Sequence, residues 1–295
     1  MGGYFEKFHV LPPNMRGALF VIMGTAFFVL TDIVVKFTGD RIHPAQMSIF
    51  RYGVGFILLA PLFIRTGRTK LRTKRLKLHF VRALLAAVGQ AGIFYTVIHL
   101  QLADATAMTF TRPLFLTILA IFILKEVVGA HRWSATLIGF TGVIVMMRPF
   151  GGEVDIAWGV ALITALLFSS GLIIIRVLGR DDPPGTILFW YHIFGIIIFV
   201  GPAAYVWVHP TLEEWVLLCL IATFTAVGMN FFVRGFSVGE SSLMGTMEYI
   251  RLVFAALAGY LIFTEVPDLW TWVGAGIIVS ATLYITQHEA KHGKS

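Results

Sequence analysis

Ten apolar stretches of about 20 residues follow one another along this chain, and they constrain its fold more than any other feature. A helix needs about 20 mostly apolar residues to cross ~30 Å of hydrocarbon. The connections between the stretches are short and contain turn residues. The sequence therefore predicts an all-α integral membrane protein with ten transmembrane helices. The predicted spans cover, roughly, residues 16–37, 44–64, 80–100, 105–124, 132–149, 157–178, 186–206, 213–233, 240–263 and 268–286.

The composition agrees with this reading. Hydrophobic residues make up 57% of the chain and charged residues only 13%, whereas soluble domains carry about 25% charged residues. The single cysteine, Cys219, cannot form an internal disulfide. These figures exclude a water-soluble enzyme, a disordered chain and a disulfide-stabilised scaffold.

Positive charge gathers in the connections on one side of the predicted membrane domain. The connection after the second span carries Arg65, Arg68, Lys70, Arg72, Lys74, Arg75 and Lys77. Connections on the other side carry the acids Glu153, Asp155, Glu213, Glu214, Glu265 and Asp268. The positive-inside rule then predicts an inner-membrane protein with both termini in the cytoplasm. A patch for anionic lipid or nucleic acid is the alternative reading of the basic connection, but topology alone explains it, so we expect no nucleic-acid partner.

The two halves of the chain resemble each other when the sequence is aligned with itself at one constant shift, without a gap. Apolar coincidences are common in such a sequence, but matches of arginine, glutamate and tryptophan at one shift are not. The matched pairs include Gly89 with Gly228, Met108 with Met247, Arg112 with Arg251, Glu126 with Glu265 and Trp133 with Trp272. We therefore expect two copies of a five-helix unit, over residues 1–152 and 153–295.

Five spans is an odd number, so the second copy must enter the membrane inverted relative to the first. Inverted repeats around a site near the bilayer midplane are typical of secondary transporters, which expose that site to each side in turn. The repeat therefore favours transport but does not identify a substrate.

Several ionisable residues fall inside the predicted spans, where each costs at least ~2.5 kcal/mol unless it faces a partner or water. Arg112 lies about 10 Å from one membrane boundary and Arg251 about 12–16 Å from the other. Glu248 is three residues from Arg251 and able to pair with it. Asp32 is at the depth of Arg112 and Arg51 and able to pair with either. These groups are predicted to bind or gate a zwitterionic or anionic solute, or else to join helices as structural pairs.

Other polar and aromatic residues are weaker candidates for the site. Gln90 and Tyr95 on the third span and Asn230 on the eighth are predicted either to hydrogen-bond a solute or to hold helices together. Phe28, Phe168 and also Tyr95 are candidates to contact an apolar part of the substrate, with core or lipid packing as the alternative. Lys36 and Arg82 lie closer to span ends, where long side chains can extend to the interface.

The chain has no HExxH motif, no paired cysteines and no P-loop. We therefore expect no metal, cofactor or ATP motor, and transport that is passive or driven by an ion gradient. Glu248 or Asp32 is able to carry a proton, but the sequence does not show that either does.

Two segments resemble a known family. The segment from Glu248 to Phe254, continuing to Glu265, is similar to the ninth helix of EamA-type members of the drug/metabolite transporter superfamily. The segment from Thr111 to Phe115, continuing to Glu126, is similar to the fourth. The resemblance implies two EamA units with a central cavity lined mainly by helices 1, 3, 4, 6, 8 and 9. That lining would include Gln90, Arg112, Asn230, Glu248 and Arg251.

Together these features predict a secondary transporter that moves a small metabolite, with an amino acid or similar amphiphile as the leading candidate, out of the cell by alternating access. A nucleobase or drug-like exporter is an alternative within the same class. A membrane-embedded enzyme acting on a lipid-linked substrate, or a passive channel, are alternatives from other classes. The expected partners are the small-molecule substrate and membrane lipid. The sequence leaves the oligomeric state open.

Overall fold

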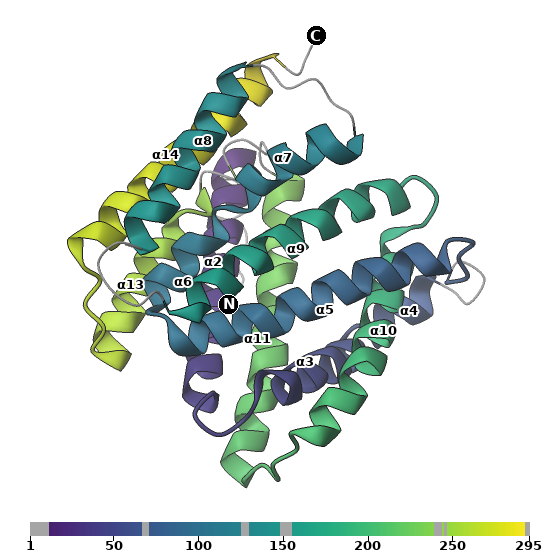
Figure 1. Cartoon of the computed structure of the whole chain (residues 1–295). Helices are drawn as coiled ribbons and strands as arrows, with labels where there is room; N and C mark the ends of the chain where they lie inside the picture. The colour runs from purple at the N-terminus through teal and green to yellow at the C-terminus, as the bar shows by residue number, and fades with distance from the viewer. Residues whose placement is uncertain are drawn as a thin grey trace.

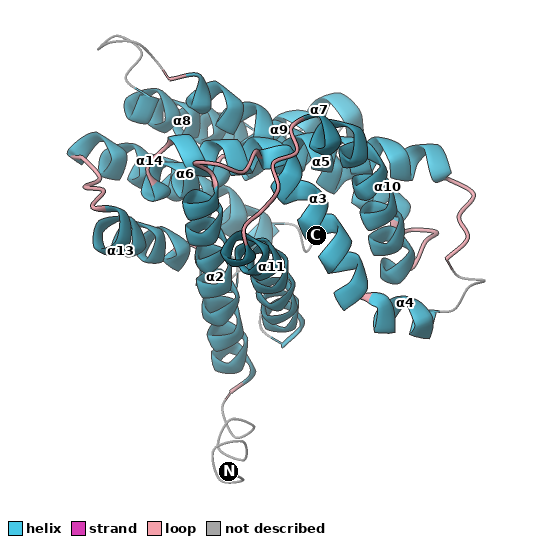
Figure 2. Ribbon diagram, turned by 90° about the horizontal axis from the view of Figure 1, so that it is seen from below, coloured by secondary structure: helices cyan, strands magenta, loops and turns pink. Residues whose placement is uncertain are grey.

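The computed structural model describes residues 12–66, 71–124, 130–147, 155–238, 244 and 247–292. Within these ranges the chain is helical, with no strand (Figure 2). The first half contains α2 (Pro13–Thr38), α3 (Pro44–Leu58), α4 (Ala60–Thr66), α5 (Leu76–His99), α6 (Leu102–Thr109), α7 (Arg112–Leu124) and α8 (Ala130–Met147). The second contains α9 (Ile156–Leu178), α10 (Pro184–Tyr205), α11 (Leu212–Val238), α13 (Ile250–Phe263) and α14 (Leu269–His292). The predicted all-α fold is confirmed.

Five helices, α2, α5, α9, α10 and α11, are long and apolar enough to cross a membrane as single rods. The other predicted spans are shorter or divided. The span expected over 44–64 is divided into α3 and α4, and the span over 105–124 into α6 and α7.

The helices pair as two inverted repeats require. Helix α2 packs along α11, and their counterparts in the other repeat, α9 and α5, pack along each other (Figure 1). The remaining large contacts join counterparts directly, α3 with α10 and α8 with α14. A two-fold axis between the halves explains these contacts. It carries the α2–α11 pair onto the α9–α5 pair, and it exchanges the two members of the α3–α10 and α8–α14 pairs.

The α3–α10 contact shows this relation residue by residue. Tyr52 packs so close to Gly195 that a Cβ there would overlap its ring. In the same way, a Cβ on Gly55 would lie 3.0 Å from Nε2 of His192. One shift of the sequence carries Tyr52 onto His192 and also Gly55 onto Gly195. In this part of the chain the repeat shift is therefore one position longer than the shift that matches the two arginines.

Close approach of α2 and α11 depends on glycine. A Cβ on Gly24 would lie 2.9 Å from the carbonyl oxygen of Gly228 and 3.0 Å from the backbone nitrogen of Phe232. Because both neighbours are backbone atoms, they cannot move without separating the helices. Two glycines facing each other let the backbones touch, as small residues do in membrane helix pairs.

We expect Gly24→Ala to lower the stability of the protein by about 1–3 kcal/mol, the usual effect of overpacking. The measurement is thermal unfolding of the purified protein in detergent. The matched control is Gly159→Ala in α9, where an added Cβ meets nothing within 4 Å. The control should be neutral or stabilising by less than about 1 kcal/mol, since alanine favours helix over glycine. Equal effects of the two substitutions would contradict the close α2–α11 contact.

The two ends of the helix bundle differ in charge. The acidic end carries the connections 39–43, 100–101, 206–211 and 264–268, and the basic end carries 71–75 and 179–183. At the acidic end Arg41 pairs with Glu214. At the basic end Arg75 pairs with Asp181 at 2.7 Å, and Asp182 accepts from Thr73 at 2.8 Å. Each end is thus fastened by contacts between the two repeats.

Candidate functional site

A break in the fourth span positions Arg112. Helix α6 ends at Thr109 and α7 begins at Arg112. Between them, the N–H groups of Phe110 and Thr111 donate to carbonyls only three residues back, at 3.0 and 3.2 Å. Pro113 explains the break, because proline has no N–H and disfavours helical geometry in the residue before it. The prediction of one continuous helix over 105–124 was wrong at this point, and Pro113 was the signal that could have shown it.

The ninth span is irregular at the equivalent place. Glu248 and Tyr249 form a turn, and α13 begins at Ile250. The N–H of Arg251 donates to the carbonyl of Glu248 at 3.0 Å, again three residues back. No proline accompanies this turn, so the sequence contained no comparable signal. Both arginines therefore stand at the start of a half-length helix, which is how many transporters build a midplane site.

Each arginine lies on a phenylalanine, and each phenylalanine lies on a glycine. The guanidinium of Arg112 is 4.6 Å from the ring centroid of Phe168, and that of Arg251 is 5.6 Å from the ring of Phe28. Behind these rings, a Cβ on Gly89 would lie 3.4 Å from Phe168, and one on Gly228 would lie 3.1 Å from Phe28. The two repeats thus supply the same three-residue unit twice, and the predicted residues Phe28 and Phe168 lie beside the arginines.

Two carboxylates complete the charged group. Asp32 on α2 accepts from Nη2 of Arg251 at 2.8 Å, and the two side chains retain 10% and 12% exposure. Arg112 interacts electrostatically with Arg251, Glu248 and Asp32, so all four charges lie near one another. Asp32 therefore pairs with Arg251 and with neither Arg112 nor Arg51, the partners that the sequence suggested. Glu248 was expected to pair with Arg251. It lies close enough to interact electrostatically with this arginine, but the two side chains form no direct ion pair.

The charged group breaks the symmetry of the repeats. At the shift that carries Tyr52 onto His192, the counterpart of Asp32 is Leu172, whose side chain is 48% exposed. Arg112 consequently has no ion-pair partner among the described residues, and its Nε is buried without a hydrogen bond. Arg251 is thus paired with a carboxylate of the other repeat, whereas Arg112 has no such partner within the described ranges.

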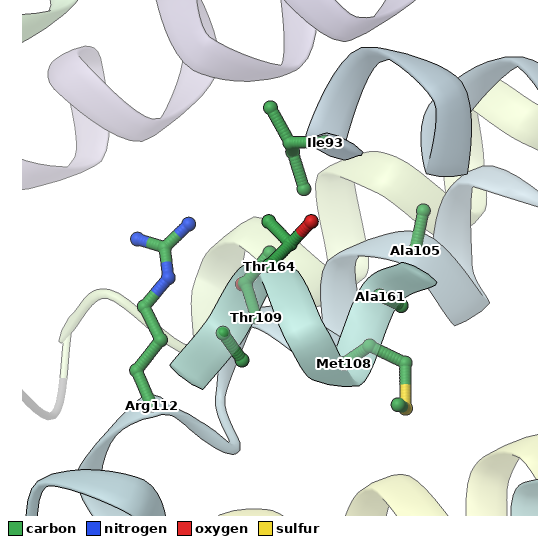
Figure 3. A pocket seen from close by; sticks show the side chains of 8 residues that line it. Ile93, Ala105, Met108, Thr109, Arg112, Ala161 and Thr164 are labelled. Carbon is green, nitrogen blue, oxygen red and sulfur yellow. The ribbon is translucent and has the colours of Figure 1, made fainter. Parts of the chain in front are cut away.

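A small pocket lies beside Arg112. Its empty volume is about 180 Å³, but almost none of this space is wide enough for a water molecule. The guanidinium of Arg112 extends alongside Thr109 and Thr164 (Figure 3). A metabolite would therefore fit only if the surrounding helices moved apart. The full lining is Ile93, Ala105, Met108, Thr109, Arg112, Ala161, Thr164 and Ala165.

The remaining predicted residues are distributed differently. Gln90 is buried on α5 with 5% exposure. Tyr95 stacks on His99 at 3.9 Å between ring centroids. Asn230 is exposed on α11, in the part of the helix where Met229 and Val233 are also exposed. The structure thus brings Asp32, Arg112, Glu248 and Arg251 together and leaves these three outside their direct contacts.

Arg51 lies in a separate cluster with Tyr191, whose hydroxyl it contacts at 3.0 Å. A role for Arg51 as the ion-pair partner of Asp32 is therefore wrong. Among the described residues no group of three or more His, Cys, Asp or Glu side chains could hold a metal ion.

The sequence analysis missed a cross-link that closes the acidic end. Lys36, at the end of α2, pairs with Glu265 and donates to the carbonyl of Leu100 at 2.6 Å. The other oxygen of Glu265 accepts from the N–H of Leu102 at 2.8 Å. Lys36 was expected to extend to the interface, but its side chain is only 15% exposed. The signal available was the apolar context of Lys36 together with the turn at Glu265.

Comparison with known proteins identifies the family. The EamA-like transporter family matches residues 15–148 and again residues 156–287. The chain belongs to this family. The resemblance noted from the segments around Arg112 and Arg251 is confirmed, and the protein is a membrane transporter of the EamA type built from two copies of one unit.

Curated relatives match almost the whole chain. An S-adenosylmethionine uptake transporter of Rickettsia bellii is 30% identical over 91% of this chain and 95% of its own length. A riboflavin transporter of Rhizobium johnstonii is 28% identical over 93% and 92%. The pseudopaline exporter CntI of Pseudomonas aeruginosa is 25% identical over 94% and 98%. Relatives with a similar sequence identity to this chain are thus named for different substrates, and their names include both uptake and export.

A solved structure shares the fold of this chain. One crystallised chain superposes with a TM-score of 0.62 at 15% identity, over 94% of this chain and 98% of its own. At this identity the likeness concerns the fold alone.

Proposed function

We propose that this protein is a secondary carrier that works by alternating access and binds a zwitterionic metabolite carrying an amino-acid group. The observation that carries the proposal is the group of four charges, in which Asp32 on α2 faces Arg112, Glu248 and Arg251 at two broken spans. Two arginines and two carboxylates can receive both ends of a zwitterion, and the inverted repeat favours one arginine on each side of the midplane.

Each residue has a role in this proposal. Arg112, which lacks an ion-pair partner among the described residues, binds the substrate carboxylate. Glu248 binds the ammonium group, since it has electrostatic contact with both arginines but no direct ion pair within the described part of the chain. Phe28 and Phe168 offer ring faces to the rest of the molecule. Asp32 keeps Arg251 neutralised until the substrate arrives.

The relatives narrow the choice of first substrate. S-adenosylmethionine contains an amino-acid group, a sulfonium cation and an adenine ring. Its carboxylate suits an arginine, its two cationic groups suit the carboxylates, and its adenine ring suits the phenylalanine rings. Simple amino acids share the first feature only and are the second candidate. Riboflavin is uncharged at neutral pH and uses the four charges least.

Counterflow in proteoliposomes tests the function. Vesicles loaded with unlabelled S-adenosylmethionine should accumulate labelled S-adenosylmethionine transiently, and the rate should saturate with concentration. A channel would show no stimulation by the solute on the opposite side, and an enzyme would convert the label into product. Amino acids, nucleobases and riboflavin form the comparison panel. Failure of every zwitterion to exchange, with exchange of an uncharged solute, would overturn the proposed substrate class.

Alternating access requires the cross-link of Lys36, Glu265 and Leu102 to open. We expect Glu265→Gln to increase several-fold the rate at which a reagent added at the acidic end reaches the central site. The readout is labelling of a cysteine at Ile93, in a variant lacking Cys219, by a membrane-impermeant maleimide. Glu213→Gln, an exposed change at the same end, is the matched control and should leave the labelling rate unchanged. Equal labelling rates in the two variants would show that the cross-link is not a gate.

We also propose that the basic end faces the cytoplasm and that both termini lie there, because arginine and lysine gather in that connection. A fluorescent protein that folds only in the cytoplasm, fused after Ser295, should then be bright. The export direction stays a proposal, since a carrier runs along whichever gradient drives it.

A further inference from the structure

A second group of charges lies between α3, α5 and α10, in which Arg82 is buried and Arg51 is half-buried. Nη1 of Arg51 donates to the hydroxyl of Tyr191 at 3.0 Å. The guanidinium of Arg82 lies 4.5 Å from the ring centroid of the same tyrosine. Tyr52 packs edge-on to Tyr191 at 4.9 Å and lies under Arg51 at 5.5 Å. Two cations from two different helices therefore share one tyrosine.

No acid balances these two charges. Among the residues that the structure describes, no carboxylate lies within ion-pair distance of Arg51 or Arg82. Asp182 is bound by His79, one turn before Arg82 on α5, and by Thr73, each at 2.8 Å. Within the described ranges, Arg82 makes a single hydrogen bond, a long one of 3.4 Å to the carbonyl of Ile187.

Hydrogen-bond donors exceed acceptors in this cluster. A guanidinium has five N–H donors and no acceptor, yet Arg51 and Arg82 make one hydrogen bond each with a described protein atom. The hydroxyl of Tyr52 is buried without a hydrogen bond in the described structure, and it lies close to Arg51 and Tyr191. A buried hydroxyl without a hydrogen bond is costly, and no carboxylate among the described residues is close enough to accept from this hydroxyl or from the two guanidinium groups.

Extension to the membrane surface does not relieve the charges. Arg51 is seven residues into α3, about 10 Å from the acidic end, and Arg82 is six residues into α5, about 9 Å from the basic end. Arg82 is only 8% exposed. An uncompensated cation at such depth is expensive and marks a functional site by default.

We propose that Arg51, Arg82 and the hydroxyl of Tyr52 bind a small inorganic anion, with chloride as the probe. A monatomic anion accepts several hydrogen bonds at once and removes one unit of the net charge. Its size suits the cluster, because Tyr52 is fully buried and pressed against Gly195. A phosphate-bearing metabolite would need more space. The proposal does not depend on the transported solute, since the cluster is built on residues outside the four-charge group.

Chloride-dependent stability tests the inference. The purified protein is unfolded by heat in sodium gluconate in which chloride replaces gluconate at constant ionic strength. A ligand that binds only the folded state raises the melting temperature saturably, and we expect a rise of ~5 °C. Arg51→Gln should abolish the rise. The matched control is Arg72→Gln, an exposed arginine at the basic end, which should retain it.

A direct measurement covers the case in which Arg51→Gln does not fold. Wild-type protein should bind radioactive chloride saturably, and unlabelled bromide should compete while gluconate should not. Absence of saturable binding to the wild type would overturn the proposal. So would an equal chloride response in folded Arg51→Gln. A rival possibility is that the carboxylate of the transported solute occupies the cluster. In that case Arg51→Gln would abolish stabilisation by the solute but not stabilisation by chloride, and this result would also overturn the chloride proposal.

Discussion

Arg112→Gln should reduce transport at least tenfold while the protein remains folded. A hydrogen bond to a charged group contributes about 1.5–3 kcal/mol, and each 1.4 kcal/mol is about a factor of ten in affinity. The substitution should not unfold the protein, because Arg112 has no ion-pair partner among the described residues and its Nε has no hydrogen bond there. Removing a buried charge that is not held in an ion pair leaves no unpaired partner behind.

Counterflow rates and melting temperatures of the same preparations check this expectation. Arg72→Gln removes the same charge from an exposed position and should transport at the wild-type rate. A variant Arg112→Gln that transports normally would remove Arg112 from the substrate site. A variant that unfolds would show that its contact with Phe168 is structural.

Arg251→Gln should behave differently, because it leaves Asp32 buried without its cation. Breaking a buried pair in this way costs about 3–5 kcal/mol, so the melting temperature should fall by at least ~5 °C. The double variant Asp32→Asn with Arg251→Gln should recover most of this loss, since a neutral pair of amides needs no counter-charge. Transport should stay low in both variants, because one half of the four-charge group is gone.

Thermal unfolding of Asp32→Asn, of Arg251→Gln and of the double variant gives the coupling energy between Asp32 and Arg251. Strictly additive losses would show that the contact between the two side chains contributes nothing to stability. Recovery of transport in the double variant would show that the pair only joins α2 to α13.

The fold was largely predictable from the sequence, for a physical reason. Hydrocarbon leaves a chain few choices, so long apolar stretches predict helices, and an odd number of helices per repeat predicts inversion. The matches of Arg112 with Arg251 and of Gly89 with Gly228 also carried structural meaning, since each glycine supports the ring on which the equivalent arginine lies. The repeat boundaries at 152 and 153 stay a prediction.

The contacts between side chains of different helices were less predictable. The position of a residue within a span gives its depth in the membrane but not the direction in which its side chain points. Asp32, Arg51 and Arg112 share a depth, yet Asp32 turns toward Arg251 of the other repeat. The same limitation concealed the pairing of Lys36 with Glu265, whose residues are 229 positions apart. The substrate roles assigned to Gln90, Tyr95 and Asn230 stay predictions, and their positions outside the four-charge group make them weaker candidates.

The presence of Asp32 in one repeat alone has an evolutionary consequence. In a homodimer of identical five-helix subunits, each substitution is present in both subunits. An aspartate beside the arginine of one subunit would therefore be accompanied by a second aspartate beside the arginine of the other. A single chain that contains both units can instead place an aspartate beside one arginine alone. A chain divided between Met147 and Asp155 should accordingly need both halves, and two copies of the first half should not reconstitute the carrier.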